Sequence, residues 1–78
     1  MAAFKSKKEL VYEHLRTEIL HSTYPPGKRL VIDGLSAELG ISQIPIREAL
    51  QQLQAEGFVT MEPHVGFRVA ELEANVIW

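Results

Sequence analysis

The sequence predicts a mainly α-helical fold with a small β-hairpin, the arrangement of a winged helix-turn-helix with three helices and a wing. Three observations predict it. Apolar residues recur at helical spacing in three segments between residues 8 and 56. A Gly-Ile-Ser sequence at 40–42 separates the second segment from the third. After Gly57 the apolar period shortens from 3.6 towards 2.

The first predicted helix covers residues 8–21. Val11, Leu15 and Ile19 recur every four positions and form one apolar face. The sequence Tyr24-Pro25-Pro26-Gly27 prevents the helix from continuing, because proline lacks an amide hydrogen and the residue before a proline disfavours the helical region. A turn is therefore expected after this helix.

A second, two-turn helix is predicted next. The run at 30–32 is expected either to pair as a brief strand or to lead directly into this helix. Asp33 is a favourable N-cap, and Gly40 stands where a left-handed residue would end the helix. Leu35 and Leu39 supply its apolar positions.

The third predicted helix runs from its N-cap at Ser42 to about Glu56, and Gly57 closes it. Pro45 is tolerated because it falls in the first turn, where backbone amides have no intrahelical partner. One face of this helix is apolar and the opposite face is polar but nearly uncharged. The apolar face holds Ile46, Ala49, Leu50 and Leu53, and the polar face holds Gln43, Arg47, Gln51 and Gln54.

Two short runs, 58–62 and 67–70, are predicted to pair as a β-hairpin through the four-residue connection Pro63-His64-Val65-Gly66. A helix pair followed by a hairpin indicates duplex DNA binding, with the second helix of the pair in the major groove. The hairpin then reaches phosphates or the minor groove nearby. The pattern alone leaves open a three-helix domain whose hairpin has no binding role.

Several motifs occur in order along residues 10–70: Leu15-Arg16, Pro25-Pro26-Gly27, Leu39-Gly40-Ile41-Ser42, Pro45-Ile46-Arg47-Glu48-Ala49-Leu50 and Glu56-Gly57. Together they resemble the N-terminal DNA-binding domain of the GntR family of transcription regulators. They are most similar to the subgroup with an all-helical, FadR-type effector domain. The resemblance implies sequence-specific binding of operator half-sites by a homodimer of the intact regulator. It also implies an effector metabolite that acts only through a further, C-terminal domain.

The resemblance assigns the central DNA contact to Arg47, which matches the recognition-helix arginine of the family. A guanidinium binds guanine O6 and N7 bidentately or clamps a phosphate. The alternative is a surface ion pair of Arg47 with Glu48 or Glu56.

Three further positions match the family's DNA-contacting residues. The Ser42 hydroxyl either caps the third helix or binds a phosphate beside the helix N-terminus. His64 and Gly66 match the wing tip. Glycine there either lets the backbone approach DNA closely or is only required by the turn. Lys28 and Arg29 precede the second helix and are expected to contact backbone phosphate.

The chain departs from the family's pattern at three positions. The family commonly has arginine where this chain has Gln43, a small hydroxyl residue at Ile44, and arginine at Val65. Either these changes weaken binding, or they redirect it. Gln43 can read adenine through N6 and N7, and Ile44 can pack on a thymine methyl group.

A competing interpretation is a winged-helix module that binds another protein. It is supported by the low charge of the polar helix face and by Ile44 and Val65, which are apolar at expected surface positions. The net charge of −2 gives no sign of nucleic-acid binding. Since six of the eight basic residues lie at or before Arg29, we expect a modest intrinsic affinity for DNA.

Composition argues against several other classes of function. A chain of 78 residues builds one small core and no deep substrate cleft. No paired acid, base or nucleophile and no phosphate-binding glycine loop occurs, so we expect neither an enzyme nor a cofactor. His14 and His21 lie seven residues apart, and there is no cysteine, so no metal site is expected. No apolar run is long enough to span a bilayer, and we expect a cytoplasmic protein that binds no membrane.

The predicted domain organisation has three parts. Residues 1–8 form a flexible basic arm with lysines at 5, 7 and 8, and residues 9–70 form the winged helix-turn-helix. Residues 71–78 form the start of a linker to a C-terminal domain that this sequence does not contain.

Overall fold

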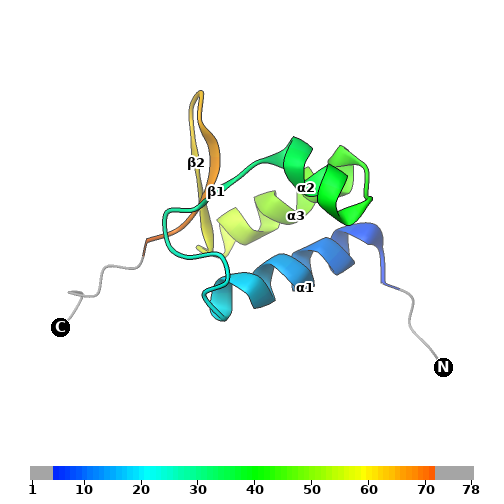
Figure 1. The fold of residues 1–78 in the computed structure, drawn as a ribbon, viewed down its shortest axis with the longest axis horizontal. Coiled ribbons are helices and arrows are strands. Elements are labelled where there is room, and N and C mark those ends of the chain that lie inside the picture. Colours follow the sequence, from blue (N-terminus) through cyan, green and yellow to red (C-terminus); the bar gives the residue numbers. More distant parts are fainter. Residues whose placement is uncertain (1–4, 72–78) are drawn as a thin grey trace.

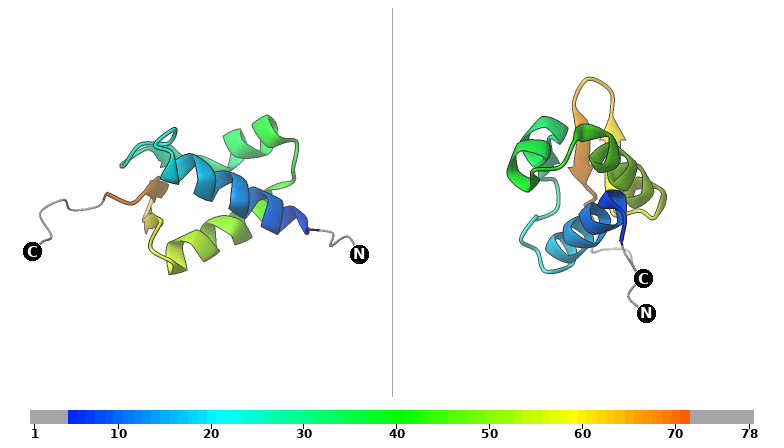
Figure 2. Two further views of the ribbon diagram at one scale, coloured as in Figure 1. Left: turned by 90° about the horizontal axis from the view of Figure 1, so that it is seen from below. Right: turned by 90° about the vertical axis from the view of Figure 1, so that its right-hand side faces the viewer.

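The structure is a computed structural model that describes residues 5–71. Its elements follow in the order α1 (Lys7–Leu20), β1 (Arg29–Leu30), α2 (Ile32–Leu39), α3 (Gln43–Ala55), β2 (Val59–Glu62) and β3 (Gly66–Val69). The strands form one antiparallel sheet in the order β1-β3-β2, and the tip of the β2–β3 hairpin projects away from the helices (Figures 1 and 2). The predicted fold class, three helices plus a small wing, is confirmed.

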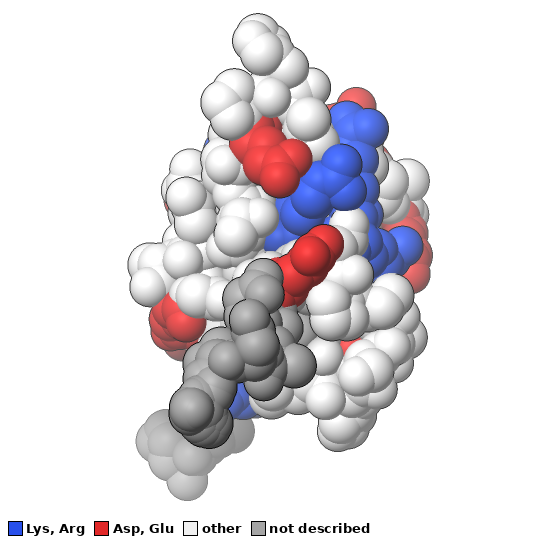
Figure 3. All heavy atoms as spheres, turned by 90° about the vertical axis from the view of Figure 1, so that its left-hand side faces the viewer, with Lys and Arg blue, Asp and Glu red and all other residues white. Residues whose placement is uncertain are grey.

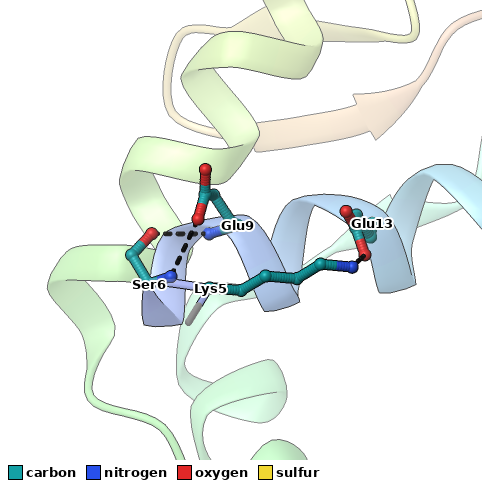
Figure 4. A network of polar contacts seen from close by, with 4 residues as sticks. All are labelled: Lys5, Ser6, Glu9 and Glu13. Carbon is teal, nitrogen blue, oxygen red and sulfur yellow. Dashed lines mark hydrogen bonds and ion pairs between the residues drawn. The ribbon is translucent and has the colours of Figure 1, made fainter. Parts of the chain in front are cut away.

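The helix α1 begins with a reciprocal capping box, drawn in Figure 4. The Ser6 hydroxyl accepts a hydrogen bond from the Glu9 amide at 3.1 Å, and the Ser6 amide donates to the Glu9 carboxylate at 2.9 Å. Lys5 Nζ lies 2.6 Å from a Glu13 carboxylate oxygen. The predicted arm is therefore corrected, because residues 7–8 belong to the first turn of α1.

Two predictions fall partly or wholly outside the described residues. The first four residues of the predicted arm lie outside them. The same holds for the predicted linker beyond Glu71, which is its one described residue.

The start of α2 also differs from the prediction. The N-cap is Val31, with φ −99° and ψ 122°, and no side chain caps the helix. Asp33 lies in the first turn instead. The reason is that Leu30 pairs with Phe67 of β3, so the chain leaves the sheet and enters the helix within two residues. The prediction that the helix ends at Gly40 is confirmed, because this residue has φ 69° and the left-handed conformation.

The hairpin connection is one residue shorter than predicted. Glu62 pairs with Gly66, which leaves three residues between the strands. The Val65 amide donates to the Glu62 carbonyl at 3.1 Å. Pro63 at the second position of this turn and the positive φ of 66° at His64 match the requirements of a type II turn.

One hydrophobic core lies between α1, α3 and the inner face of the sheet. Leu15 of α1 and Ile46 of α3 are fully buried. Burial alternates along β3, where Phe67 and Val69 face the core and Arg68 does not. The buried set is Val11, Leu15, Leu30, Leu35, Ile46, Ala49, Leu50, Leu53, Val59, Phe67 and Val69. Because the core takes one face of α3, the first turn and the polar face of that helix remain at the surface.

Candidate nucleic-acid interface

The first turn of α3 presents its side chains to solvent. Ser42, Gln43 and Ile44 are exposed, and the Ile44 side chain is 69% exposed. Ser42 occupies the N-cap position, but its hydroxyl makes no capping hydrogen bond. The first turn contains no acidic residue, so the unpaired amides and the positive end of the helix dipole favour an anion there. The arrangement leaves the Ser42 hydroxyl free to bind a phosphate.

Arg47 is exposed one turn further along α3. Within residues 5–71 its guanidinium forms no ion pair at 4.0 Å or less, so the predicted alternative of a pair with Glu48 or Glu56 is not formed. Glu56 instead accepts hydrogen bonds from the Tyr12 hydroxyl at 2.5 Å and from Gln52 at 3.3 Å. The charge of Arg47 is therefore available to an external ligand.

A surface hollow of about 250 Å³ lies between α3, β1, the start of α2 and the wing. Arg47 lines it from α3, Arg29 from β1, and Val65 and Gly66 from the wing. The fold thus brings three of the predicted site residues from separate elements to one place, together with Val65.

Arg29 also lies opposite Arg68 on the antiparallel pair β1–β3. Like charges directly opposite each other on a sheet are destabilising. Arg68 offsets this with an ion pair to Glu62 at 3.1 Å and a hydrogen bond to the Gly27 carbonyl at 3.0 Å. Figure 3 shows basic side chains gathered in one band below the projecting hairpin, with acidic side chains beside it.

Sequence reasoning did not include Arg68 in the site. The signal that reveals it is the strand register, which places it beside Arg29. Lys28 is exposed, but its ammonium group lies over the Tyr24 ring, 5.5 Å from the centroid, and it does not line the hollow of Arg47. Lys28 and Arg29 together line a second hollow beside Tyr24, so Arg29 borders both hollows and Lys28 only this one.

The wing tip has two residues in positive-φ conformations, His64 at 66° and Gly66 at 103°. A Cβ on Gly66 would meet no atom within 4 Å. Glycine is therefore favoured at this position by the backbone conformation and not by lack of space. The same open space leaves the Gly66 backbone accessible from outside. His64 is exposed at the tip.

A second contact missed by sequence reasoning joins the two helices of the helix-turn-helix. Gln43 Nε2 donates to a carboxylate oxygen of Asp33 at 2.6 Å. Asp33 was predicted as a helix N-cap, a role that needs only local sequence. Its actual partner lies across the turn on α3, and only the relative placement of the two helices reveals it.

The opposite end of α3 is tied to α1 by the hydrogen bond between Tyr12 and Glu56. The bond raises the pKa of the Tyr12 hydroxyl, and it lowers the pKa of the Glu56 carboxyl. Arg16 lies over the ring of Phe58, 5.5 Å from its centroid. At this end of α3 the polar groups therefore contact one another, whereas at the first turn the Ser42 hydroxyl makes no capping bond and the Ile44 side chain is exposed.

Residues 7–69 match the family described as bacterial regulatory proteins, gntR family. The chain belongs to this family. It is 42% identical over 55 residues to the Nta operon transcriptional regulator of Aminobacter aminovorans, a match covering 70% of this chain and 26% of that protein. It is 34% identical over 61 residues to the HTH-type transcriptional repressor GlaR of Escherichia coli, covering 78% of this chain and 28% of that protein.

Solved GntR structures have the same fold. A GntR family regulator from Pseudomonas syringae superposes with a TM-score of 0.79 at 36% identity, covering 85% of this chain and 28% of that one. A GntR regulator from Rhodococcus gives 0.84 at 32% identity, covering 88% and 33%. The chain thus spans about a quarter to a third of the length of these relatives.

The predicted family and domain type are confirmed by these matches. The chain is a GntR-family helix-turn-helix, the DNA-binding domain of transcription regulators. The matched family and relatives are regulators and not enzymes. In the part of the chain that the structure describes, no helix is long and apolar enough to span a bilayer.

Proposed function

We propose that this GntR domain reads an operator half-site with α3 in the major groove and the wing near the minor groove. Gln43, Ile44 and Arg47 then lie nearest the base edges, and the wing tip at His64 to Gly66 lies near the sugar-phosphate backbone and the minor groove. The observation that carries the proposal is the hollow shared by Arg47, Arg29 and the wing, next to an exposed first turn of α3.

Each side chain has a chemistry suited to its proposed contact. The exposed guanidinium of Arg47 binds guanine O6 and N7 or a phosphate. The uncapped hydroxyl of Ser42 binds a phosphate at the helix N-terminus. Arg29 and Lys28 contact the phosphate backbone, which fixes the register of the domain on the duplex without reading sequence.

The low basic charge shapes the proposed assembly. With a net charge of −2, one domain neutralises few phosphates and binds one half-site modestly. Two copies on half-sites one helical turn apart bind more tightly through effective concentration. We therefore propose that the domain acts as part of a homodimeric cytoplasmic regulator, in which an effector metabolite binds to another domain.

The test is a salt titration on a duplex selected by this chain from a random DNA library. Binding is followed by fluorescence anisotropy from about 50 to 200 mM salt. We expect the logarithm of the association constant to fall linearly with the logarithm of salt concentration, by about 0.9 for each phosphate contact. Failure to enrich any duplex, or binding that does not change with salt, would contradict the proposal.

The same titration addresses the protein-interaction alternative. Ile44, 69% exposed on the face that is proposed to meet DNA, is the residue that a protein contact would use. A contact dominated by such apolar surface changes little with salt. The family match favours DNA as the ligand of this face.

A further inference from the structure

The bond between Asp33 and Gln43 fixes which way the glutamine amide points. Gln43 is the first residue of α3, and Asp33 lies in the first turn of α2. An ionised carboxylate accepts hydrogen bonds and cannot donate them. The nitrogen of the Gln43 amide must therefore face Asp33, 2.6 Å from its oxygen. The amide oxygen and one remaining N–H hydrogen are left for an external partner.

Among residues 5–71, Gln43 is the only side chain that is bonded to Asp33. Asp33 forms no ion pair within 4.0 Å, and its carboxylate accepts no other hydrogen bond from a side chain. It also does not cap α2, whose N-cap is Val31. Asp33 lines the hollow of Arg47, on the surface where DNA is proposed to lie, although a carboxylate there repels phosphate. Orienting Gln43 is the role that this position supports.

The remaining polar edge of Gln43 has one acceptor and one donor. In the major groove adenine offers the N6 amino donor and the N7 acceptor, which complement that edge. Guanine offers two acceptors, O6 and N7, and pairing with both requires two donors. One of the two amide hydrogens of Gln43 is already taken by Asp33. The oriented amide therefore matches adenine and mismatches guanine.

We propose that Asp33 is a positioning residue for base specificity, which makes Gln43 select adenine over guanine at one base pair of each half-site. The proposal rests on the proposed placement of α3 in the major groove. It does not require Asp33 to touch DNA.

The experiment measures relative affinities, because a merely structural bond between α2 and α3 would change stability and leave base preference unaltered. The base pair read by Gln43 is first identified as the one whose discrimination is lost in Gln43→Ala. Wild type, Asp33→Ala and Asp33→Asn are then titrated with four duplexes that differ only at that base pair. Glu38→Ala is the matched control, because it removes one negative charge from an exposed position of the same helix.

We expect wild type to prefer adenine over guanine at that base pair by about 5- to 150-fold. In Asp33→Ala the ratio of the affinities for adenine and guanine falls several-fold. The variant does not weaken binding to all four duplexes by the same factor. Asp33→Asn narrows the ratio too, because an asparagine amide can donate to the Gln43 oxygen and permits the flipped orientation. Glu38→Ala leaves the ratio unchanged. Thermal melting of each variant confirms that it is folded.

An unchanged adenine-to-guanine ratio in folded Asp33→Ala and Asp33→Asn would overturn the inference while leaving the proposed function intact. If wild type prefers a base other than adenine at the base pair read by Gln43, the inference is also overturned and the proposed function again remains. Absence of salt-dependent DNA binding by wild type would instead remove the proposed function, and this inference with it.

Discussion

The two ends of α3 differ in how their polar side chains are used. At the C-terminal end Glu56 accepts hydrogen bonds from Tyr12 and Gln52, and the adjacent Leu53 is fully buried. At the N-terminal end Ile44 is 69% exposed, and Arg47 forms no ion pair within the described residues. The C-terminal end is bonded to α1, whereas the N-terminal end, apart from the bond between Gln43 and Asp33, presents its side chains to solvent.

Because of this difference, substitutions in α3 can change either the stability of the domain or its affinity for DNA, depending on the end of the helix at which they lie. Substitutions at the C-terminal end remove contacts to α1 and should lower the free energy of unfolding. Substitutions at the N-terminal end remove few internal contacts and should change affinity for DNA instead.

Leu53→Ala is expected to have the largest effect. Leu53 is fully buried between α3 and the rest of the core, and truncating such a leucine costs about 2–5 kcal/mol of the free energy of unfolding. Urea denaturation measured by circular dichroism checks the value. A loss below about 1 kcal/mol would show that the core tolerates the cavity and would break the proposed division.

Arg47→Ala is expected to weaken binding to the selected duplex by about 1–3 kcal/mol, because it removes a base or phosphate contact. The free energy of unfolding should stay within about 0.5 kcal/mol of wild type, since Arg47 is exposed and forms no ion pair among residues 5–71. Gln54→Ala, exposed further along the same helix, is the matched control and should leave affinity unchanged. Equal affinities of wild type and Arg47→Ala would remove Arg47 from the interface.

Gly66→Ala is expected to cost about 1–2 kcal/mol of stability, because its φ of 103° is rarely adopted by residues with a side chain. There is no clash to add, since a Cβ at this position meets nothing within 4 Å. Ala55→Gly is the comparison. It changes an exposed residue at the C-terminal end of α3, where the flexibility of glycine also lowers the stability of the helix. If Gly66→Ala has the same denaturation midpoint as wild type, the turn changes its conformation to accommodate the alanine without loss of stability.

Tyr12→Phe is expected to have the smallest effect, a slight loss of stability at neutral pH with no change in DNA affinity. The hydrogen bond from Tyr12 lowers the pKa of Glu56. The contribution of this bond to the free energy of unfolding is therefore present above pH 4.5, the ordinary pKa, and is lost as the pH falls through the folded-state pKa. The raised pKa of Tyr12 sets the other limit, so the contribution is lost as pH rises through that value, above 10.0.

Melting temperatures of wild type and Tyr12→Phe should therefore differ at neutral pH and converge as the pH falls below the lowered pKa of Glu56. A difference that persists unchanged at the lower pH would show that the Tyr12 hydroxyl stabilises the fold independently of the ionised Glu56 carboxylate.

Much of the architecture was readable from sequence because it depends on local patterns. The apolar period placed all three helices within a few residues, and the left-handed requirement at Gly40 located the turn between α2 and α3. The capping box of Ser6 and Glu9 has an equally local signature, a serine followed three residues later by a glutamate, and it starts α1 within the predicted basic arm.

The remaining features depend on contacts between distant residues. The Arg29–Arg68 pairing follows from strand register across the sheet, and the bond from Gln43 to Asp33 follows from the angle between two helices. Neither of these two contacts can be predicted from residue spacing or composition. The place of Arg47 on the polar face predicts its exposure, but only the structure shows that it forms no ion pair in the described part of the chain.

We expect DNA to contact the N-terminal end of α3 and the wing, and not the end of α3 that is bonded to α1. The most direct measurement is an amide chemical-shift titration of the ¹⁵N-labelled chain with the selected duplex. We predict the largest changes at residues 42–47, at Arg29 and at residues 64–66, with Tyr12 and Glu56 unaffected. Changes concentrated around Tyr12 and Glu56, with residues 42–47 unchanged, would contradict the account.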